Sequence, residues 1–167
     1  HHFAHKASSD CSRSKGESKE HLRAKILIYE WAKKKQMKCE LEMPLETPMG
    51  KRIADIYIEY QGKKYAIEIQ KSPIDGIDLE RRTESYRSIS VHVIWVPMLR
   101  KTENISTWQT WIILANNNRC WFWDQDEEGF WMPNIVTMSS AKGKPYFDWM
   151  GINKKTTTYS FLELSLK

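Results

Sequence analysis

Apolar and polar residues recur with two different periods in the first part of the chain. In residues 14–35 apolar side chains return every three or four positions, which predicts a helix with one apolar face. Ser14 and Glu17 have the spacing of a capping box, so we expect the helix to begin there. Residues 38–45 instead alternate apolar with polar side chains, which is typical of a strand with one buried face.

Four further elements follow, separated by turn-forming residues. Residues 53–60 and 64–70 predict two strands joined by a tight hairpin turn. Residues 77–89 predict a second helix, and the continuous apolar run 91–96 is typical of a strand buried on both faces. The predicted order is helix, three strands, helix, strand. The last two strands are expected to be parallel because a helix connects them, so the pattern favours a compact α/β core.

The periods weaken after residue 100. Residues 105–114 fit a short helix or a strand. Residues 119–123 and 129–136 fit a β-hairpin, whereas 142–151 have no period and predict a loop. This change predicts a boundary near residue 100, with a mostly β appendage after it.

Charge divides the chain at the same place. The 167 residues carry 26 Lys and Arg against 21 Asp and Glu, a net charge of +5. Residues 1–100 hold 19 of the basic and 14 of the acidic residues, whereas residues 101–167 hold 7 of each. The basic excess therefore lies in the first hundred residues, and a basic surface suits a polyanion such as nucleic acid.

Composition excludes several classes of protein. Hydrophobic residues make up 41% of the chain and charged residues 28%, a globular balance rather than a disordered one. No apolar run approaches the ~18 residues of a membrane span, so we expect no membrane association. Cys11, Cys39 and Cys120 are too few and too scattered for a disulfide framework, which favours a reducing, cytoplasmic setting.

Two carboxylates stand in the middle of apolar strands. Asp55 interrupts the strand 53–60, and Glu68 interrupts the strand 64–70. A carboxylate in such a place is costly unless it is paired or binds a metal. Since a tight hairpin joins the strands, the two side chains come from neighbours about 4.8 Å apart. They can hold one Mg²⁺ between them, because this ion prefers hard oxygen ligands.

Polar side chains on two segments extend this acidic pair. Gln70 lies two residues after Glu68 on the same strand face, where its amide can hydrogen-bond a metal-bound water. Glu17, His21 and Lys25 follow one another at i, i+4 and i+8 on the first predicted helix. Such a polar stripe can hold a second metal-bound water and a phosphate.

The same residues have a simpler interpretation. Asp55 and Glu68 can lie on the solvent face of an edge strand, and the stripe on the first helix can be a solvated surface. Each feature taken alone favours that interpretation. Their joint order, a helix glutamate, a strand aspartate, a hairpin, a strand Glu-x-Gln and a crossover helix, favours a functional site.

This order resembles the PD-(D/E)xK nucleases, which have the restriction-endonuclease-like fold, and more narrowly the competence protein CoiA family. The resemblance covers residues 2 to about 97. The residues that carry it are His2 to Lys6, Gly16 to Ser18, Glu20 to Leu22 with Lys25, Arg52 to Ile56, Ala66 to Gln70 with Ser72 and Pro73, and Arg82 to Tyr86. It implies an α/β fold with an αβββαβ core and a mixed sheet.

The resemblance also implies a function, that of a bacterial, metal-dependent DNA nuclease in a family that handles incoming DNA. Asp55 and Glu68 take the metal-ligand roles, with Mg²⁺ or Mn²⁺ as the cofactor. Gln70 and Glu17 take catalytic roles. Gln70 stands where most of the superfamily has lysine, so the missing cation is expected from Lys25 or Arg82.

The beginning of the chain allows two interpretations. In the CoiA family the His-Phe-Ala-His-Lys stretch follows a Cys-rich segment that resembles a zinc ribbon, but no C-x-x-C spacing precedes it here. Residues 1–13 are therefore either a remnant of a zinc site with His5 and Cys11 or an unbound tail, and we expect no Zn²⁺. The predicted organisation continues with a nuclease-like domain, 14–100, and a Trp-rich appendage, 101–167.

DNA is the expected partner of the basic first part of the chain. His21 and Lys25 are expected to support catalysis. The candidate phosphate contacts are Arg81, Arg82, Lys63 and Lys64, which would position DNA rather than select its sequence. The sequence thus predicts a DNA nuclease, with a non-cleaving DNA-binding or recombination-partner module as the alternative. It leaves the oligomeric state open.

Six of the eight tryptophans lie after residue 100. Trp121 and Trp123 share one face of a predicted strand, with Phe122 on the other. These rings can form the core of the appendage, stack unpaired bases or bind a protein partner.

Overall fold

The computed structural model describes residues 17–98, 105–116, 120–124, 126, 129–131, 135–139 and 145–149. The expectations for the segment 1–13 and for a cap at Ser14 lie outside these residues.

The first part of the chain folds in the predicted order. Its elements are α1 (Lys19–Lys34), β1 (Lys38–Leu45), β2 (Arg52–Tyr60), β3 (Lys63–Gln70), α2 (Gly76–Arg87) and β4 (Val91–Pro97). The four strands form one sheet in the order β1-β2-β3-β4. The β1–β2 and β2–β3 pairs are antiparallel, and the β3–β4 pair is parallel. This mixed sheet in an αβββαβ order confirms the restriction-endonuclease-like core.

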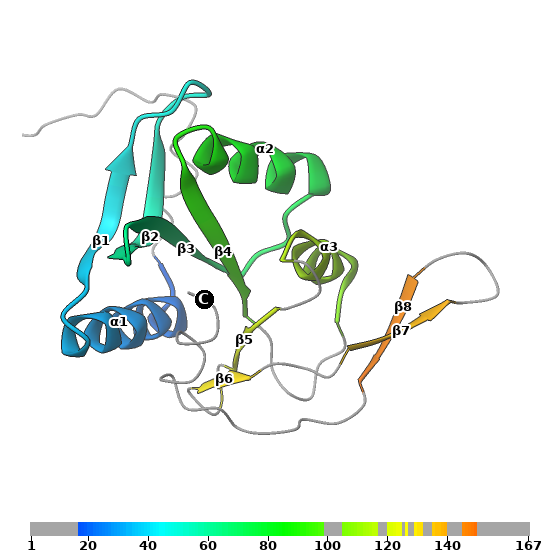
Figure 1. Cartoon of the computed structure of the whole chain (residues 1–167). Helices are drawn as coiled ribbons and strands as arrows, with labels where there is room; N and C mark the ends of the chain where they lie inside the picture. The colour runs from blue at the N-terminus through cyan, green and yellow to red at the C-terminus, as the bar shows by residue number, and fades with distance from the viewer. Residues whose placement is uncertain are drawn as a thin grey trace, which may run out of the picture.

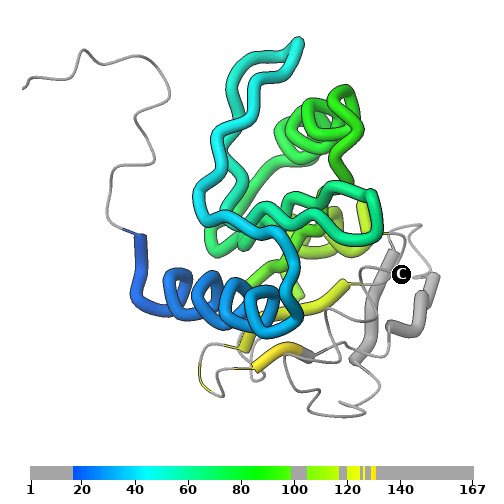
Figure 2. Tube along the Cα trace, turned by 60° about the vertical axis from the view of Figure 1, so that its left-hand side comes forward, coloured from blue at the N-terminus to red at the C-terminus, as the bar shows by residue number. Residues whose placement is uncertain are grey.

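The two helices of the core pack on opposite faces of the sheet (Figure 1), and Figure 2 shows them again along the Cα trace, with α1 in blue and α2 in green. The α1-side cluster joins Ala24, Ile28 and Trp31 to the sheet residues Ile56 and Ile67. The α2-side cluster contains Ala54, Tyr57, Ala66, Tyr86 and Val91. The sheet is therefore the middle layer of the core, and side chains of the two helices approach it from both sides.

The first helix begins later than the sequence pattern predicts. Ser18 is its N-cap, because its extended backbone (φ −71°, ψ 152°) lets its hydroxyl accept a hydrogen bond from the His21 amide at 3.3 Å. Glu17 therefore lies before the helix rather than inside a capping box. Because it precedes the first turn, its side chain is free of helical geometry and can turn back towards the helix face.

The β2–β3 hairpin sets the register of the two central strands. Gln61 and Gly62 both have left-handed backbones (φ 49° and 76°), as both central residues of a two-residue type I′ hairpin turn must. The pairing that follows from this turn ends at Ile56 opposite Ile67. One further step along each strand reaches Asp55 and Glu68, so the turn brings these two residues to the same level of the sheet.

The described residues after β4 form a helix and four short strands. These are α3 (Thr107–Ala115), β5 (Phe122–Asp124), β6 (Gly129–Trp131), β7 (Ile135–Ser139) and β8 (Pro145–Trp149). The predicted β-hairpin is present as the β5–β6 pair. The prediction of a loop over residues 142–151 is wrong, because β8 pairs along its length with β7.

Residues of the β5–β6 hairpin pack against both sides of the core. Trp121, Trp123 and Phe130 belong to the α1-side cluster. Phe122 lies with Trp95 in a third cluster, which α2 and α3 share. The predicted opposition of Phe122 to the two tryptophans is confirmed. Both tryptophans are buried core residues, and the division of the chain at residue 100 stays a sequence-based prediction.

Among the described helices, none is both long and apolar enough to cross a membrane. Cys39 and Cys120 are free thiols, and both are buried.

Candidate active site

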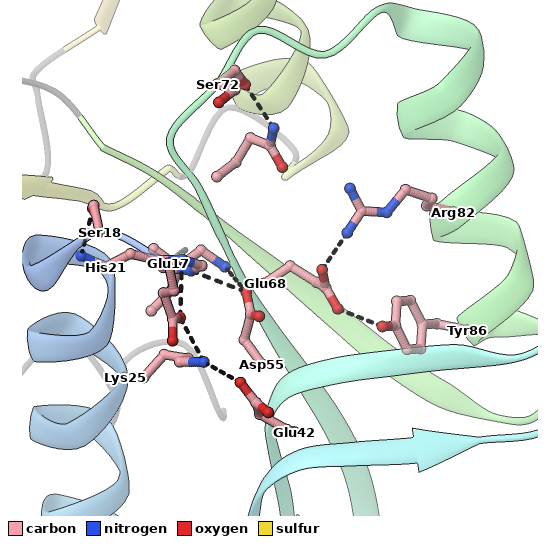
Figure 3. A network of polar contacts seen from close by, with 12 residues as sticks. Glu17, Ser18, His21, Lys25, Glu42, Asp55, Glu68, Ser72, Arg82 and Tyr86 are labelled. Carbon is pink, nitrogen blue, oxygen red and sulfur yellow. Dashed lines mark hydrogen bonds and ion pairs between the residues drawn. The ribbon is translucent and has the colours of Figure 1, made fainter. Parts of the chain in front are cut away.

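A cavity of about 690 Å³ opens beside the start of α1, where β2 and β3 separate. Figure 3 shows side chains from α1, β1, β2, β3 and α2 converging there. Among the cavity-lining residues are seven that the sequence singled out: Glu17, His21, Lys25, Asp55, Glu68, Gln70 and Arg82. These residues come from distant parts of the chain, so the fold itself gathers them.

Asp55 stands at a break in the sheet. In the strand pairings of the described residues, it has no Cα partner on β1 or on β3. Its Oδ2 instead accepts a hydrogen bond from the backbone amide of Ile69 at 2.9 Å. The pleat also shifts here, because Ala54 and Tyr57 lie in the α2-side cluster whereas Ile56 lies in the α1-side cluster. Regular alternation along residues 53–60 would place Ala54 and Ile56 on one face, and the structure separates them at Asp55. The Asp55 carboxylate takes the place of a backbone acceptor for the Ile69 amide.

Asp55 also contacts the first helix. The same Oδ2 lies 3.3 Å from Nε2 of His21, whose Nδ1 lies 3.1 Å from Glu17. Desolvation by burial raises the pKa of Asp55, but the hydrogen bonds from His21 and the Ile69 amide and the nearby Lys25 outweigh it. The net pKa lies below the usual value, so Asp55 is ionised at neutral pH.

The neighbouring strand is distorted at the same level. Glu42 of β1 has a left-handed backbone (φ 51°), which is uncommon for a residue other than glycine, asparagine or aspartate. Like Asp55, it is skipped in the β1–β2 pairing. Its carboxylate accepts a hydrogen bond from Lys25 at 2.7 Å. Because strained backbone concentrates at functional sites, this distortion supports a role for the region beyond packing.

Lys25 is a buried cation in this group. The residue is only 2% exposed, and its Nζ lies 2.5 Å from Glu17 and 2.7 Å from Glu42. Burial lowers the pKa of Lys25, but the hydrogen bonds to the two carboxylates raise it more, so the net pKa is above the usual value. The side chain is therefore a fixed positive charge on the α1 side of the cavity.

Glu68 lies on the α2 side and is also buried. It is 2% exposed; Arg82 donates to its Oε2 and the hydroxyl of Tyr86 donates to its Oε1. Asp55 and Glu68 thus line one cavity, but one contacts α1 and the other contacts α2. Figure 3 shows the two carboxylates between these helices.

Gln70 occupies the outer end of the same strand. Its amide nitrogen donates to the backbone carbonyl of Ser72 at 2.6 Å. This contact leaves the amide oxygen Oε1 as the atom that can accept a hydrogen bond from a molecule in the cavity.

Three of the predicted phosphate contacts do not join the cavity. Arg81 is exposed and pairs with Asp78 at 2.5 Å. Lys63 and Lys64 lie at the first residues of β3, whereas Glu68 and Gln70 lie near its end. With a rise of about 3.3 Å per residue, the two ends of this strand are roughly 20 Å apart. Of the predicted phosphate contacts, Arg82 is the one that lines the cavity.

Four residues at the site were not among the predicted site residues, although two of them, Ser72 and Tyr86, belong to the segments that carry the family resemblance. Glu42, Lys71 and Ser72 line the cavity, and Tyr86 binds Glu68 from α2. Glu42 is one of three charged positions on the alternating segment 38–45, so the pattern alone does not separate it from a solvent-facing residue. Tyr86 is four residues from Arg82, a helical spacing that marks a shared face and is a sequence signal for it.

The donor set suits a hard cation such as Mg²⁺. In the described part of the chain, no group of three or more His, Cys, Asp and Glu side chains forms a ready metal centre. Mg²⁺, however, is usually bound by one or two protein carboxylates and keeps several waters. Asp55 and Glu68 meet that lower requirement. The cavity lining carries four carboxylates and the three cations Lys25, Lys71 and Arg82, a near-balance that a divalent ion would turn positive.

Comparison with protein families gives one match. The family model described as "Competence protein CoiA, nuclease-like domain" matches residues 17–162. This range contains every described residue of the cavity. A search of curated proteins gives no match.

Solved structures with a similar arrangement are remote from this chain in sequence. An XisH family protein from Nostoc punctiforme PCC 73102 has 14% identity and a TM-score of 0.41, with 65% of this chain and 95% of that chain covered. An fdxN element excision controlling factor protein from Anabaena variabilis has 18% identity and a TM-score of 0.39, with the same coverage. At these values neither likeness supports an argument about function.

Proposed function

This chain belongs to the family of CoiA nuclease-like domains, and we propose that it is a Mg²⁺- or Mn²⁺-dependent deoxyribonuclease that hydrolyses phosphodiester bonds. The observation that carries the proposal is the convergence of Glu17, Asp55, Glu68 and Gln70 in one cavity. Asp55 and Glu68 come just past the end of the β2–β3 pairing, and the desolvation of each carboxylate carries a cost to folding.

The proposed roles follow from the contacts of each side chain. Asp55 and Glu68 would hold the cation. A bound Mg²⁺ lowers the pKa of its water and neutralises charge on the phosphate. Gln70 would orient the attacking water, because its amide nitrogen donates to the Ser72 carbonyl and its amide oxygen can accept a hydrogen bond from that water. Glu17 would orient His21 and Lys25 through its contacts at 3.1 Å with Nδ1 of His21 and 2.5 Å with Nζ of Lys25.

DNA is the proposed substrate on the grounds of charge and family. The net charge of +5 lies in the part of the chain that forms the core and the cavity. The family name refers to competence, which supports a role in handling incoming DNA. We place the protein in the cytoplasm, a location that the two buried free thiols of the described residues suit.

One observation favours a second function, a DNA-binding module that does not cleave. Arg82 and Tyr86 already occupy both oxygens of Glu68, and Gln70 lacks the charge that lysine would supply. A site arranged in this way can hold DNA, or a recombination partner on DNA, without binding a metal.

Cleavage of plasmid and oligonucleotide DNA in Mg²⁺, Mn²⁺ or EDTA separates the two functions. We expect cleavage in Mg²⁺ or Mn²⁺ and none in EDTA. Asp55→Asn and Glu68→Gln should each lower the rate at least 100-fold, since each removes a charge that would hold the cation. Glu59→Gln is the matched control, because Glu59 lies on β2 but pairs with Lys38 outside the cavity.

Two results would contradict the nuclease proposal. Cleavage that persists in EDTA would reject the metal mechanism, and full Mg²⁺-dependent activity in Glu68→Gln would reject the assigned site. DNA binding without cleavage under every condition would favour the second function.

A further inference from the structure

We propose that Arg82 exchanges one partner for another: it neutralises Glu68 in this structure, and it binds a DNA phosphate when a divalent cation neutralises Glu68 instead. The inference rests on the proposed function and deepens it. It makes Arg82 both the competitor of the cation and the phosphate-binding residue of the cavity.

The first step concerns the buried charge of Glu68. The residue is 2% exposed, and a buried carboxylate without a counter-charge would destabilise the fold strongly. Arg82 donates from its guanidinium to Oε2, whereas Tyr86 donates a neutral hydroxyl to Oε1. Arg82 is therefore a cationic partner in direct contact with this carboxylate.

The second step concerns how Arg82 itself is held. Its guanidinium carbon lies 4.7 Å from the ring centroid of Trp95, a distance at which a cation and an aromatic face attract. Trp95 is fixed, because it is 1% exposed and its indole N–H donates to Thr83 at 3.0 Å. It also stands opposite Glu68 in the β3–β4 pairing. The ring contacts the guanidinium independently of Glu68, so Arg82 keeps one attractive contact beside the cavity when that ion pair opens.

The third step is a conflict of charges. A divalent cation bound to Glu68 would lie beside the guanidinium, and like charges this close repel strongly. Tyr86 carries no charge and can keep its hydrogen bond to Oε1. Arg82 must then release Oε2, and its 17% exposed side chain already lines the cavity. The planar fork of arginine suits two phosphate oxygens, which makes DNA the natural second partner.

Lys25 is the other cation that the sequence offers for this role. It is held by two carboxylates at 2.5 and 2.7 Å and is 2% exposed, so it has more contacts to break than Arg82. A divalent ion on Glu68 also does not replace either of its partners. The geometry therefore favours Arg82 as the group that responds to the cation.

The first test is a calorimetric titration of Mg²⁺ into the full chain without DNA. Arg82→Gln removes the competitor, so we expect Mg²⁺ to bind about tenfold more tightly or better, the factor that follows from losing one charge-assisted hydrogen bond. Arg87→Gln is the control, because Arg87 lies on the same helix and pairs with exposed Glu84 away from the cavity. Affinity that is unchanged or weaker in Arg82→Gln would overturn the proposal.

The second test measures binding of a labelled oligonucleotide in EDTA. Glu68→Gln removes the charge that holds Arg82, so we expect about tenfold tighter DNA binding than in the wild type. The double variant Glu68→Gln with Arg82→Gln should lose this gain. Asp55→Asn is the control, because it also removes a negative charge from the cavity but leaves the Arg82–Glu68 pair in place. Its affinity for the oligonucleotide should increase less than that of Glu68→Gln. A gain that survives in the double variant would overturn the proposal.

These measurements keep two failures apart. Thermal unfolding checks that each variant folds, and the double variant, which leaves no unpaired charge at Glu68, guards against a misfolded Arg82→Gln. If no protein cleaves DNA but the affinities change as expected, the nuclease proposal fails and the role of Arg82 stands. If the wild type cleaves DNA and the affinities do not change, the role of Arg82 fails alone.

Discussion

At the scale of single residues, this protein keeps several polar groups in places where they carry a cost. Glu68 and Lys25 are buried, and Glu42 has a left-handed backbone. Glu68 and Lys25 have partners that offset their charge, yet replacing a buried ion pair by apolar residues is often neutral or stabilising. The side chain of Glu42 is exposed, so its cost lies in the strained backbone. The concentration of these residues around one cavity is therefore evidence for function at that site and not for stability.

Tyr57 allows a prediction about pH outside the cavity. Its burial and its hydrogen bond to Glu59 at 3.0 Å raise the pKa of the hydroxyl to about 12. An unfolded tyrosine loses its proton near pH 10. Between these values the native state holds the proton and the unfolded state does not, so the free energy of unfolding falls as pH rises. Below pH 10 this contribution is fully present.

Urea unfolding of the wild type and of Tyr57→Phe from pH 9 to 12 checks this prediction. We expect the wild type to lose stability over that range more steeply than the variant, because the variant has no proton to lose at this position. Parallel slopes for the two proteins would contradict the raised pKa. Tyr60→Phe is a suitable control on the same strand, since Tyr60 bonds the exposed amide of Gln61.

At the scale of elements, local sequence signals predicted most of the fold. Alternation in β1, the turn residues between β2 and β3, and the apolar run of β4 each mark their element without help from the rest of the chain. The sequence pattern placed the start of the first helix at Ser14, whereas α1 has Ser18 as its N-cap. Both residues are serines, and serine is a preferred residue at the N-cap of a helix. Local residue preference does not decide which of the two serines caps the helix. With Ser18 as the cap, Glu17 lies before the helix and its carboxylate contacts Lys25.

Where α2 packs against α3, Gly76 of α2 lies against the side chain of Trp111 of α3. A Cβ placed on Gly76 would lie 1.3 Å from the Trp111 ring, so the ring lies against the glycine backbone. Gly76→Ala should therefore displace Trp111 and destabilise the protein by about 1–3 kcal/mol, a usual cost of overpacking. In the Trp111→Ala background the same change should cost little or stabilise the helix by less than about 0.5 kcal/mol, because alanine is the better helix former but position 76 is only the first residue of the helix.

A double-mutant cycle on positions 76 and 111 measures how far the effect of Gly76→Ala on stability depends on the Trp111 ring. Chemical unfolding of the wild type, both single variants and the double variant gives the coupling free energy. Additive effects would show that Trp111 does not contact Gly76 in solution.

At the scale of the whole molecule, the site depends on contacts that no short window contains. The sequence offered Asp55, Glu68, Gln70 and Glu17 as separate candidates, and their residue types and spacing were enough to expect them together. It did not indicate which helix each carboxylate contacts, because that depends on the pleat shift at Asp55. Nor did it show Glu42 as part of the site, since a left-handed residue inside a strand has no distinct local pattern.

The buried core also includes residues that follow the predicted boundary near residue 100. Trp123 is 1% exposed, and it lies in the α1-side cluster with Ile28 and Ile67, far earlier in the chain. Trp123→Ala should therefore destabilise the sheet as a whole by about 3–5 kcal/mol, as loss of a buried aromatic side chain does. Leu114→Ala, a change at an exposed position, should cost within about 0.5 kcal/mol.

Hydrogen exchange distinguishes a shared core from a separate appendage. If Trp123 supports the sheet, amides of α1 and β3 should lose protection in Trp123→Ala by the same free energy that urea unfolding measures. If the segment after residue 100 folds as an independent unit, those amides should keep their protection while only the β5–β6 hairpin loses it. The cavity lies between α1 and β3, so the first result would also mean that residues after 100 help to hold the geometry of the candidate active site.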